Sequence, residues 1–193
     1  MIEMNSYKEI ITPKFFRNIF IEFGPIALFA IFFHILGPFN ATRLLMLTAV
    51  ISTVVVYKLE KRIPYITLYV TFLTILFGYM TLHRQNISFL QIRDSVYDFT
   101  LSGTLFVGLL FNSLLLKIAL SSYVKLTDKA WKFFTYLWMV FFFINGIINE
   151  YVRHNFHVSA WLNYKVIMII VTIIFTFVAL HLTLEKNKKY LNK

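Results

Sequence analysis

Long apolar runs separated by short polar stretches make up most of this sequence. Six runs come close to the roughly 20 mostly apolar residues that a helix needs to cross the hydrocarbon core of a bilayer. They cover residues 19–36, 41–57, 64–82, 101–120, 131–151 and 164–184. The pattern therefore predicts an all-α fold, a polytopic membrane helix bundle with about six transmembrane helices.

Composition agrees with a membrane protein. Of the 193 residues, 59% are hydrophobic and 15% are charged, whereas soluble domains carry roughly a quarter charged residues. The longest connection, at 83–100, is too short to fold as a soluble domain. We expect a single integral membrane domain over 1–193, with a cytoplasmic arm at 1–18, the helix bundle at 19–184 and a basic cytoplasmic tail at 185–193.

Two common sequence features are missing. There is no cysteine, which excludes disulfides, thiol nucleophiles and thiolate metal sites. The first apolar run follows a mixed segment that contains Glu3 and Glu9 and shows no cleavage pattern, so we expect no secretory signal.

Basic residues are unevenly distributed between alternate connections, which predicts the orientation. Connections rich in Lys and Arg stay on the cytoplasmic side of a membrane. Fourteen of the 19 Lys and Arg residues lie in the N-terminal arm, the turn at 58–62, the region 117–132 and the C-terminal tail. The opposite side has only Arg43, Arg84, Arg93, Arg153 and Lys165. With an even number of spans, both termini are expected in the cytoplasm.

The net charge of +10 raises the question of nucleic-acid binding. The positive residues are dispersed over short turns beside apolar runs and form no folded basic module, so we expect no nucleic-acid partner. Anionic lipid headgroups are the simpler partner, since each nearby Lys or Arg adds about 1 kcal/mol of attraction.

Amide side chains occur inside the fourth and fifth runs. Asn145 and Asn149 are four residues apart and share one helix face with Trp138 and Phe142. Because polar groups are costly in hydrocarbon, this face is predicted to point at other helices. Asn112 is the most central amide of the fourth run, and we expect it to bond to a neighbouring helix. These amides serve either as packing contacts or as a functional polar site.

Charged residues at the outer ends of the last two runs indicate an ion pair. Glu150 ends the fifth run, and Lys165 begins the sixth after a short loop containing Trp161, a typical interface anchor. We hypothesise that Glu150 and Lys165 clamp the last two helices together. Arg153 and His154, three and four residues after Glu150, are the competing partners.

The pattern allows alternatives for two features of the expected cytoplasmic half. Glu22 and Lys117 each lie about one turn inside a run and could pair, or Lys117 could extend its ammonium to the headgroups. Gly24 and Pro25 fall in the opening turns of the first run, and proline tends to kink a helix. That span is either shortened, tilted or partly re-entrant, or an ordinary helix with a proline near its start.

The outer segment ISFLQIRDSVYDFT, residues 87–100, has apolar side chains near helical spacing, with Gln91, Asp94 and Asp98 on the other side. This pattern predicts an amphipathic helix lying in the membrane interface. A plain extracellular loop is the alternative.

No spacing indicates a catalytic site. No Asp or Glu stands at the centre of a run, which argues against ion-coupled transport. His154 and His157 lie on a short outer loop without a carboxylate or thiolate cluster, so we expect solvated side chains rather than a metal site. We predict no catalytic, cofactor-binding or metal site, and no enzyme.

Several ordered segments carry a family resemblance. They are EFGPIALFAIFF, ATRLLMLTAVIS, RIPYITLYVTFLTILFGYMTL, KLTDKAWKFFTYLWMVFFFINGIINEYV and WLNYKVIMIIVTIIFTF. In this order, over about residues 22–177, they resemble the bacterial intracellular septation protein A family of inner-membrane proteins. The family pattern falls on Gly24, Pro25, Ala41, Thr42, Met46, Gly78, Thr81, Leu82, Trp131, Trp138, Phe141, Phe142, Asn149, Trp161 and Lys165.

The sequence departs from this family in two places. The outer segment of the family reads Phe-Ile-Lys-x-Lys-Pro-Thr, and here FLQIRDS places Gln91 and Asp94 where a lysine and the proline stand, while Arg93 keeps one charge. The Gln-Met-Pro-like ending of the family is replaced by ALHLTLEKNKK.

The resemblance implies a multi-pass inner-membrane protein of cell division, septum formation and cell-envelope integrity, which acts through contacts with membrane proteins of the division and elongation machinery. The leading hypothesis is a non-enzymatic scaffold. The alternative is a small channel or carrier for an apolar or lipid-like metabolite, with Glu22, Asn112, Asn145 and Asn149 lining a path. A membrane-embedded hydrolase is disfavoured. The sequence leaves open whether the chain forms a homo-oligomer.

Overall fold

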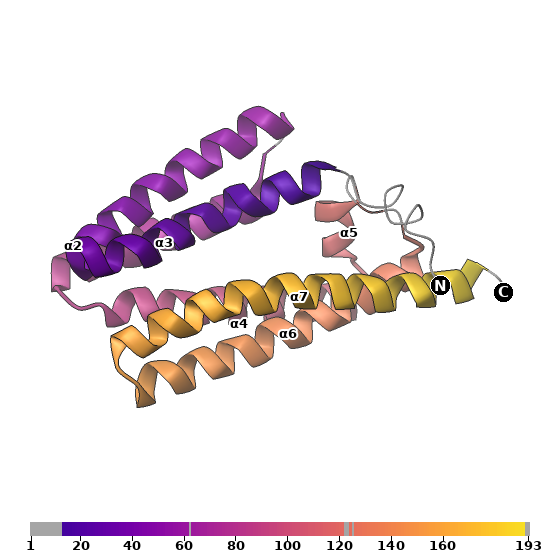
Figure 1. Cartoon of the computed structure of the whole chain (residues 1–193). Helices are drawn as coiled ribbons and strands as arrows, with labels where there is room; N and C mark the ends of the chain where they lie inside the picture. Colours follow the sequence, from indigo (N-terminus) through magenta and orange to yellow (C-terminus); the bar gives the residue numbers. More distant parts are fainter. Residues whose placement is uncertain (1–12, 62, 122–123, 125, 192–193) are drawn as a thin grey trace. The chain divides into compact units, whose positions relative to one another are not determined.

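The computed structural model describes the backbone of residues 13–61, 63–121, 124 and 126–191, and the side chains of these residues except 13–20, 22, 23 and 188–191. The described residues form helices and turns but no strand, which confirms the all-α class (Figure 1). The helices are α2 (Pro13–Glu60), α3 (Tyr65–Arg84), α4 (Ser88–Leu110), α5 (Leu115–Leu120), α6 (Asp128–Asn155) and α7 (Val158–Leu191).

Four of these helices are long and apolar enough to cross a membrane. The segments that qualify are Gly24–Glu60 in α2, Tyr65–Arg84 in α3, Asp128–Asn155 in α6 and Val158–Asn187 in α7. Length and composition thus support the membrane assignment made from the apolar runs.

The chain divides into two compact units. Unit 1 comprises Met1–Phe16, Asp98–Asn145 and Ile170–Lys193, and unit 2 comprises Arg17–Tyr97 and Gly146–Ile169. The helices α2, α4, α6 and α7 therefore contribute residues to both units.

The long helix α2 is a hairpin of two helical arms within unit 2. Gly37 has φ 77° and ψ 168°, a backbone conformation essentially restricted to glycine. The Ser52 hydroxyl donates a 2.8 Å hydrogen bond to the carbonyl of Ile21, 31 residues away in the chain. In one straight helix these residues would be about 46 Å apart. The chain therefore reverses at Gly37, as the two arms of α2 in Figure 1 show, and the first two apolar runs are separate arms.

The first arm differs from the expected first span. α2 begins at Pro13, so Pro25 lies inside the helix rather than near its start. Within α2 the only backbone outside the helical φ/ψ region is at Gly37. The helix extends further back than the apolar run, so Pro25 is not near its start, and the alternative of a tilted or partly re-entrant span stays a prediction.

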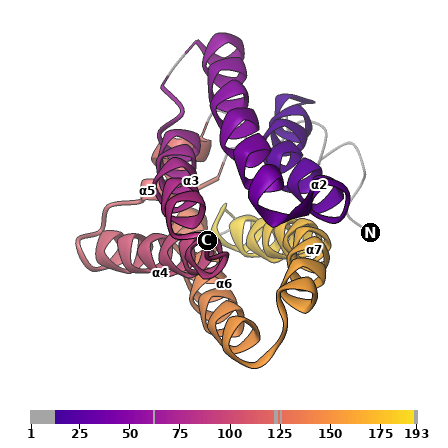
Figure 2. The same ribbon diagram turned by 90° about the vertical axis from the view of Figure 1, so that its left-hand side faces the viewer.

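The core of unit 2 joins both arms of α2 to α4 and α7. Its buried side chains are Phe29, Ala41, Leu45, Leu90, Trp161 and Leu162. The second arm also packs closely on α3, because the Thr53 and Thr71 hydroxyl oxygens are 2.6 Å apart. Figure 2 shows the short turn that connects α6 to α7, and the end of α6, this turn and the start of α7 all belong to unit 2.

The core of unit 1 is aromatic and aliphatic. Its buried residues come from α4, from α5, from the connection between α5 and α6, and from the parts of α6 and α7 that belong to this unit. They are Leu105, Leu116, Val124, Trp131, Phe134, Ala179, Leu180 and Leu184. Beside them, the rings of Phe141 and Phe175 stack with centroids 4.2 Å apart, which joins α6 to α7.

The fourth predicted span, 101–120, is not one helix. α4 ends at Leu110, Asn112 adopts a left-handed φ of 54°, and the short α5 begins at Leu115. The apolar run continued across this break because its leucines score as hydrophobic whether or not the backbone stays helical.

The helix expected within 87–100 is confirmed and the plain loop is wrong, whereas the place of this helix in the membrane interface stays a prediction. It forms the first half of α4, and its polar residues are buried, with Gln91 3%, Asp94 7% and Asp98 3% exposed, whereas Phe99 is 38% exposed. Hydropathy alone could not predict this arrangement, because the polar side of α4 is stabilised by partners on other helices.

Candidate functional site

Asn149 on α6 joins three helices of unit 2 through one buried amide. Its side chain is fully buried. The amide nitrogen donates to the backbone carbonyl of Gln91 at 3.1 Å and to the Ser95 hydroxyl at 2.7 Å, both on α4. The amide oxygen accepts the indole N–H of Trp161 on α7 at 3.1 Å. The prediction that Asn149 faces other helices is confirmed, and both ends of its amide are used.

Trp161 does not anchor the chain at the membrane surface. Its side chain is 1% exposed, and its ring meets Phe29 edge-on with centroids 6.5 Å apart. The expected interface role was wrong, because the polar N–H of this indole finds its partner in Asn149 rather than in the headgroup region.

A charged triad lies beside this amide in unit 2. Arg93 Nη2 and Nε lie 2.5 and 2.8 Å from Asp94 Oδ1, and Lys165 Nζ lies 2.9 Å from Asp94 Oδ2. Arg93 Nη1 also donates to the Thr74 hydroxyl at 3.3 Å. The triad of Arg93, Asp94 and Lys165 thus connects α4 to α3 and α7.

The contribution of this triad to stability depends on how deeply its side chains are buried. The side chains of Arg93, Asp94 and Lys165 are 8%, 9% and 14% exposed. Breaking a buried ion pair by removing one partner costs about 3–5 kcal/mol, because the other charge is left without compensation. Asp94 is the only carboxylate of the triad, so both cations depend on it.

The hypothesised pair between Glu150 and Lys165 was wrong. Lys165 contacts Asp94, and Glu150 contacts Arg153 on its own helix at 2.5 Å and His154 at 3.4 Å. The competing partners considered for Glu150 are therefore the ones observed. Arg153 lies one helical turn from Glu150 and reaches it at little conformational cost. Lys165 instead pairs with Asp94, whose carboxylate is more deeply buried than that of Glu150.

The other amides lie in unit 1. Asn145 donates to Asp98 Oδ2 at 2.7 Å, which links α6 to α4 and confirms that it faces another helix. Asn112 is not central in a span, because it lies in the exposed turn after α4. Its side-chain oxygen accepts from Lys132 Nζ on α6 at 3.3 Å, so the expected bond to a neighbouring helix is present at the end of the helix.

Two predicted residues remain, Lys117 and Glu22, both expected on the cytoplasmic side. Lys117 on α5 contacts Asp128 at the start of α6, with Nζ 2.5 Å from Oδ1. Glu22 lies in α2, but its side chain lies outside the described residues. Its pairing with Lys117 stays a prediction.

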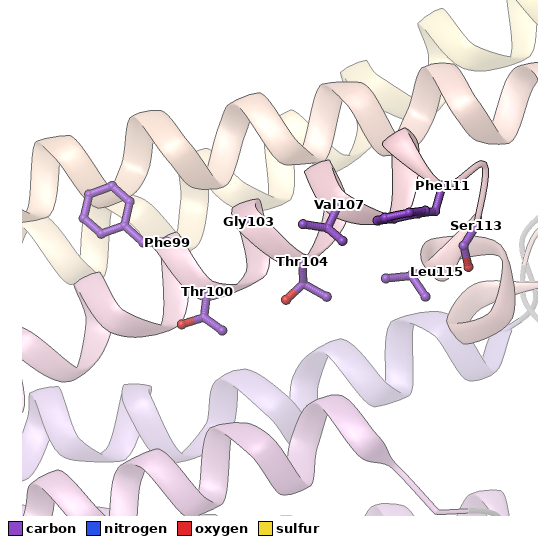
Figure 3. Close-up of a pocket in the computed structure, with 9 residues that line it drawn as sticks. Phe99, Thr100, Gly103, Thr104, Val107, Phe111, Ser113 and Leu115 are labelled. Carbon is purple, nitrogen blue, oxygen red and sulfur yellow. The ribbon is translucent and has the colours of Figure 1, made fainter.

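An open hollow of about 560 Å³ lies in unit 1 along one face of α4 and the start of α5 (Figure 3). In Figure 3, Val107, Phe111 and Leu115 gather at one end of it, and Phe99 lies at the other. Its only polar side chains are the hydroxyls of Thr100, Thr104 and Ser113. Among the described residues, no group of three or more His, Cys, Asp or Glu side chains is placed to hold a metal ion. The chemistry that this arrangement supports is helix packing.

Sequence reasoning missed Asp94, Arg93 and Ser95 as parts of the site. A signal for Asp94 and Ser95 was present, because Gln91, Asp94, Ser95 and Asp98 are three or four residues apart and so share one helix face. Arg93 lies off this face and had no such signal. We interpreted that face as solvated, but in the structure it is buried against α6 and α7.

Comparison with known proteins gives the family. The model of the family described as intracellular septation protein A matches residues 17–190. A protein called inner membrane-spanning protein YciB from Rickettsia massiliae (strain Mtu5) is 33% identical over 171 residues, which cover 86% of this chain and 93% of the relative. The protein of that name from Mesorhizobium japonicum is 29% identical over 161 residues, covering 80% and 72%.

A third protein of this name, from Brucella suis biovar 1, is 31% identical over 156 residues, covering 78% of each chain. No solved structure matches this chain. Since the family model spans both units, this chain belongs to the intracellular septation protein A family and is a multi-pass protein of the bacterial inner membrane.

Proposed function

We propose that this protein is a non-enzymatic scaffold of the inner membrane, which supports septum formation and cell-envelope integrity by binding membrane proteins of the division and elongation machinery. The observation that carries this proposal is the use of polar groups inside the protein. Asn149, Asp94 and Lys165 are all engaged in contacts between helices. A scaffold needs a rigid bundle of this kind, since its partners recognise a fixed surface.

The outward faces supply the surface for such partners. On α3, Phe72 is 60% exposed and Tyr79 is 61% exposed, and on α6, Phe143 is 52% exposed. Large apolar side chains on the outside of a membrane helix contact either lipid or the helices of another membrane protein. The same faces could join two copies of the chain in a homo-oligomer.

The placement of the amides disfavours the channel or carrier. A polar path would need these side chains along one open passage. Asn149 is fully buried and bonded at both ends, and Asn112 lies in an exposed turn. The hollow along α4 is lined mainly by apolar side chains.

Photocrosslinking in native membranes tests the scaffold. A photoreactive amino acid at Phe72 or Phe143 is expected to capture membrane proteins of division or elongation. The matched control is Leu90, which is buried and should capture none. Crosslinks to lipid alone at every exposed position, or flux of a solute into vesicles that hold the purified protein, would overturn the proposal.

Orientation is part of the same proposal. Both termini and the lysine-rich connections are proposed to face the cytoplasm, because positively charged loops stay there. Since the chain has no cysteine, single cysteines at Lys58 and Arg84 can be labelled separately with a membrane-impermeant reagent. Only the cysteine at position 84 should react in intact spheroplasts, and labelling at position 58 would contradict the orientation.

A further inference from the structure

Three connections form one end surface of unit 2. They are the reversal of α2 at Gly37, the turn between α3 and α4, and the turn between α6 and α7 (Figure 1). Ala41, Ile87 and Val158, which lie beside the three connections, belong to one hydrophobic cluster, so the connections lie together. Four of the five histidines of the chain are in or next to these connections, and all four are exposed. They are His34, His83, His154 and His157.

Two arginines add fixed positive charge to this end surface. Arg43 lies near the start of the second arm of α2, and its guanidinium donates to the side-chain oxygen of Asn40. Arg84 is the last residue of α3. Both arginines are exposed, and within the described part of the chain neither forms an ion pair with a carboxylate.

The carboxylates at this end of unit 2 are already engaged. Asp94 is buried between the two cations of the triad. Glu150 pairs with Arg153 at 2.5 Å and with His154 at 3.4 Å, both on its own helix. Neither carboxylate is therefore available to compensate the exposed arginines.

The other three histidines of the end surface contact aromatic rings or solvent. His34 meets Phe33 edge-on and His83 stacks on Tyr79, with ring centroids 5.8 and 5.7 Å apart. His157 is exposed in the turn after α6. Among the described residues, these histidines form no ion pair and no group that could hold a metal ion. Because histidine changes its charge between about pH 5 and 8, the end surface becomes more positive as the pH falls.

We propose that the end surface of unit 2 binds an acidic segment of a partner protein outside the inner membrane, and that this binding tightens as the pH falls. Cations without carboxylate partners attract an acidic segment by charge complementarity. The exposed amides of Gln85 and Asn155 add hydrogen-bonding groups for a polypeptide.

Anionic lipid headgroups also match the charge of the end surface. Lipid surrounds the sides of a helix bundle, however, whereas these groups come from connections at its end. A protein segment is therefore the better occupant. The inference rests on the proposed scaffold function and orientation, and it names the chemistry of one partner.

Contact quenching of a fluorophore at the end surface tests the proposal. Because the chain has no cysteine, Ser159→Cys in the exposed first turn of α7 provides a single thiol for the fluorophore. The full-length protein in phosphatidylcholine nanodiscs is titrated with a quencher-labelled peptide of about ten aspartates, a block of like charge. The peptide should bind about fivefold more tightly at about pH 5.5 than at about pH 7.5, since each exposed ion pair changes affinity only a few-fold.

Variants of the arginines test the fixed charge. R43Q/R84Q should weaken peptide binding by up to about fivefold for each arginine at both pH values. R43K/R84K keeps the charge and should keep the binding. The control K58Q/K61Q removes two lysines at the other end of the second arm of α2 and should bind as the native protein does.

Variants of the histidines test the pH dependence separately. H34Q/H83Q/H157Q should bind the peptide unchanged at about pH 7.5 and should lose the tightening at about pH 5.5. His181→Gln is the matched control, because His181 lies in unit 1 beside Glu185, and it should keep the full pH dependence.

Two results would overturn the proposal. One is equal affinity for the peptide at both pH values. The other is a peptide signal that R43Q/R84Q leaves unchanged, while the same variant removes quenching by headgroup-labelled phosphatidylglycerol, which would assign the surface to lipid. Protein crosslinks at Phe72 and Phe143 test the scaffold and cysteine labelling at position 84 tests the orientation, so the three proposals can fail independently.

Discussion

Ser52 supplies the hydrogen-bond donor that Pro25 removes. In a helix, the nitrogen of residue 25 would bond to the carbonyl of Ile21, but proline has no N–H. The Ser52 hydroxyl from the second arm of α2 donates to that same carbonyl at 2.8 Å, and Ser52 is only 7% exposed. A proline inside a membrane helix is tolerated when a neighbouring hydroxyl satisfies the freed carbonyl. The contact also holds the two arms of α2 together.

Ser52→Ala should therefore destabilise the protein by about 1–2 kcal/mol, since it leaves a buried carbonyl without a donor. The loss should shrink in the Pro25→Ala background, where the backbone N–H of residue 25 is restored. Reversible unfolding in detergent measures both values. Thr48→Ala is the control, because the Thr48 hydroxyl bonds only to carbonyls of its own helix. An equal effect of Ser52→Ala in both backgrounds would show that the contact does not compensate for Pro25.

Asp94→Asn should be the most damaging conservative change in the charged triad. It leaves Arg93 and Lys165 buried without their shared carboxylate, at a cost of about 3–5 kcal/mol. Glu150→Gln is the matched control, because the Glu150 side chain is 32% exposed and its ion pairs, to Arg153 and His154, stay within α6, so its loss should stay within about 1 kcal/mol. Thermal unfolding of the purified variants compares them, and similar losses would argue against the triad.

Asn149→Ala should destabilise unit 2 by removing hydrogen bonds to both α4 and α7. Polar contacts between membrane helices contribute about 0.6 kcal/mol on average and up to about 1.7, so losing both sides of this amide should cost about 1–3 kcal/mol. Trp161→Phe, which removes only the indole donor, should cost less. Asn163→Ala on the exposed face of α7 should have no effect. Chemical denaturation midpoints measure the series, and equal effects at positions 149 and 163 would contradict the contact.

Gly78 allows α3 to approach the second arm of α2. A Cβ at this position would lie 2.7 Å from Met46 Sδ, whereas a Cβ at Gly103 on α4 meets nothing within 4 Å. Gly78→Ala should therefore cost about 1–3 kcal/mol through overpacking. Gly103→Ala should be neutral or stabilising by up to about 1 kcal/mol, because alanine favours the helix. Unfolding in detergent distinguishes them, and a neutral Gly78→Ala would mean that Met46 moves aside freely.

The apolar runs predicted the class of fold and most of its helices, because the length of an apolar run directly indicates a helix that lies away from water. The first two runs flank Gly37 and Pro38, and a reversal there follows from residues with special backbone preferences. The break at Asn112 was missed, since leucines continue on both sides of it. Nearby residues thus sufficed to predict a turn that depends only on their own backbone preferences.

The partners of the polar residues could not be predicted in the same way. Only Glu150 was considered as the partner of Lys165, although Asp94 also lies near the expected outer side of the membrane. The choice depends on which face of α4 packs against α7, and that is a tertiary property. Asn149 was identified because an amide in an apolar run must find a polar partner, whereas the identity of that partner required the position of Ser95.

The most direct measurement is a double-mutant cycle between Asp94 and Lys165, which asks whether their contact holds α4 to α7. Asp94→Asn, Lys165→Gln and the double variant are compared with the native protein by reversible unfolding. We expect a coupling of about 1–3 kcal/mol, because contacting residues are not additive, and near-additive effects in the equivalent cycle between Glu150 and Lys165. Additive effects for Asp94 and Lys165 together with coupling between Glu150 and Lys165 would contradict the packing of these helices described above.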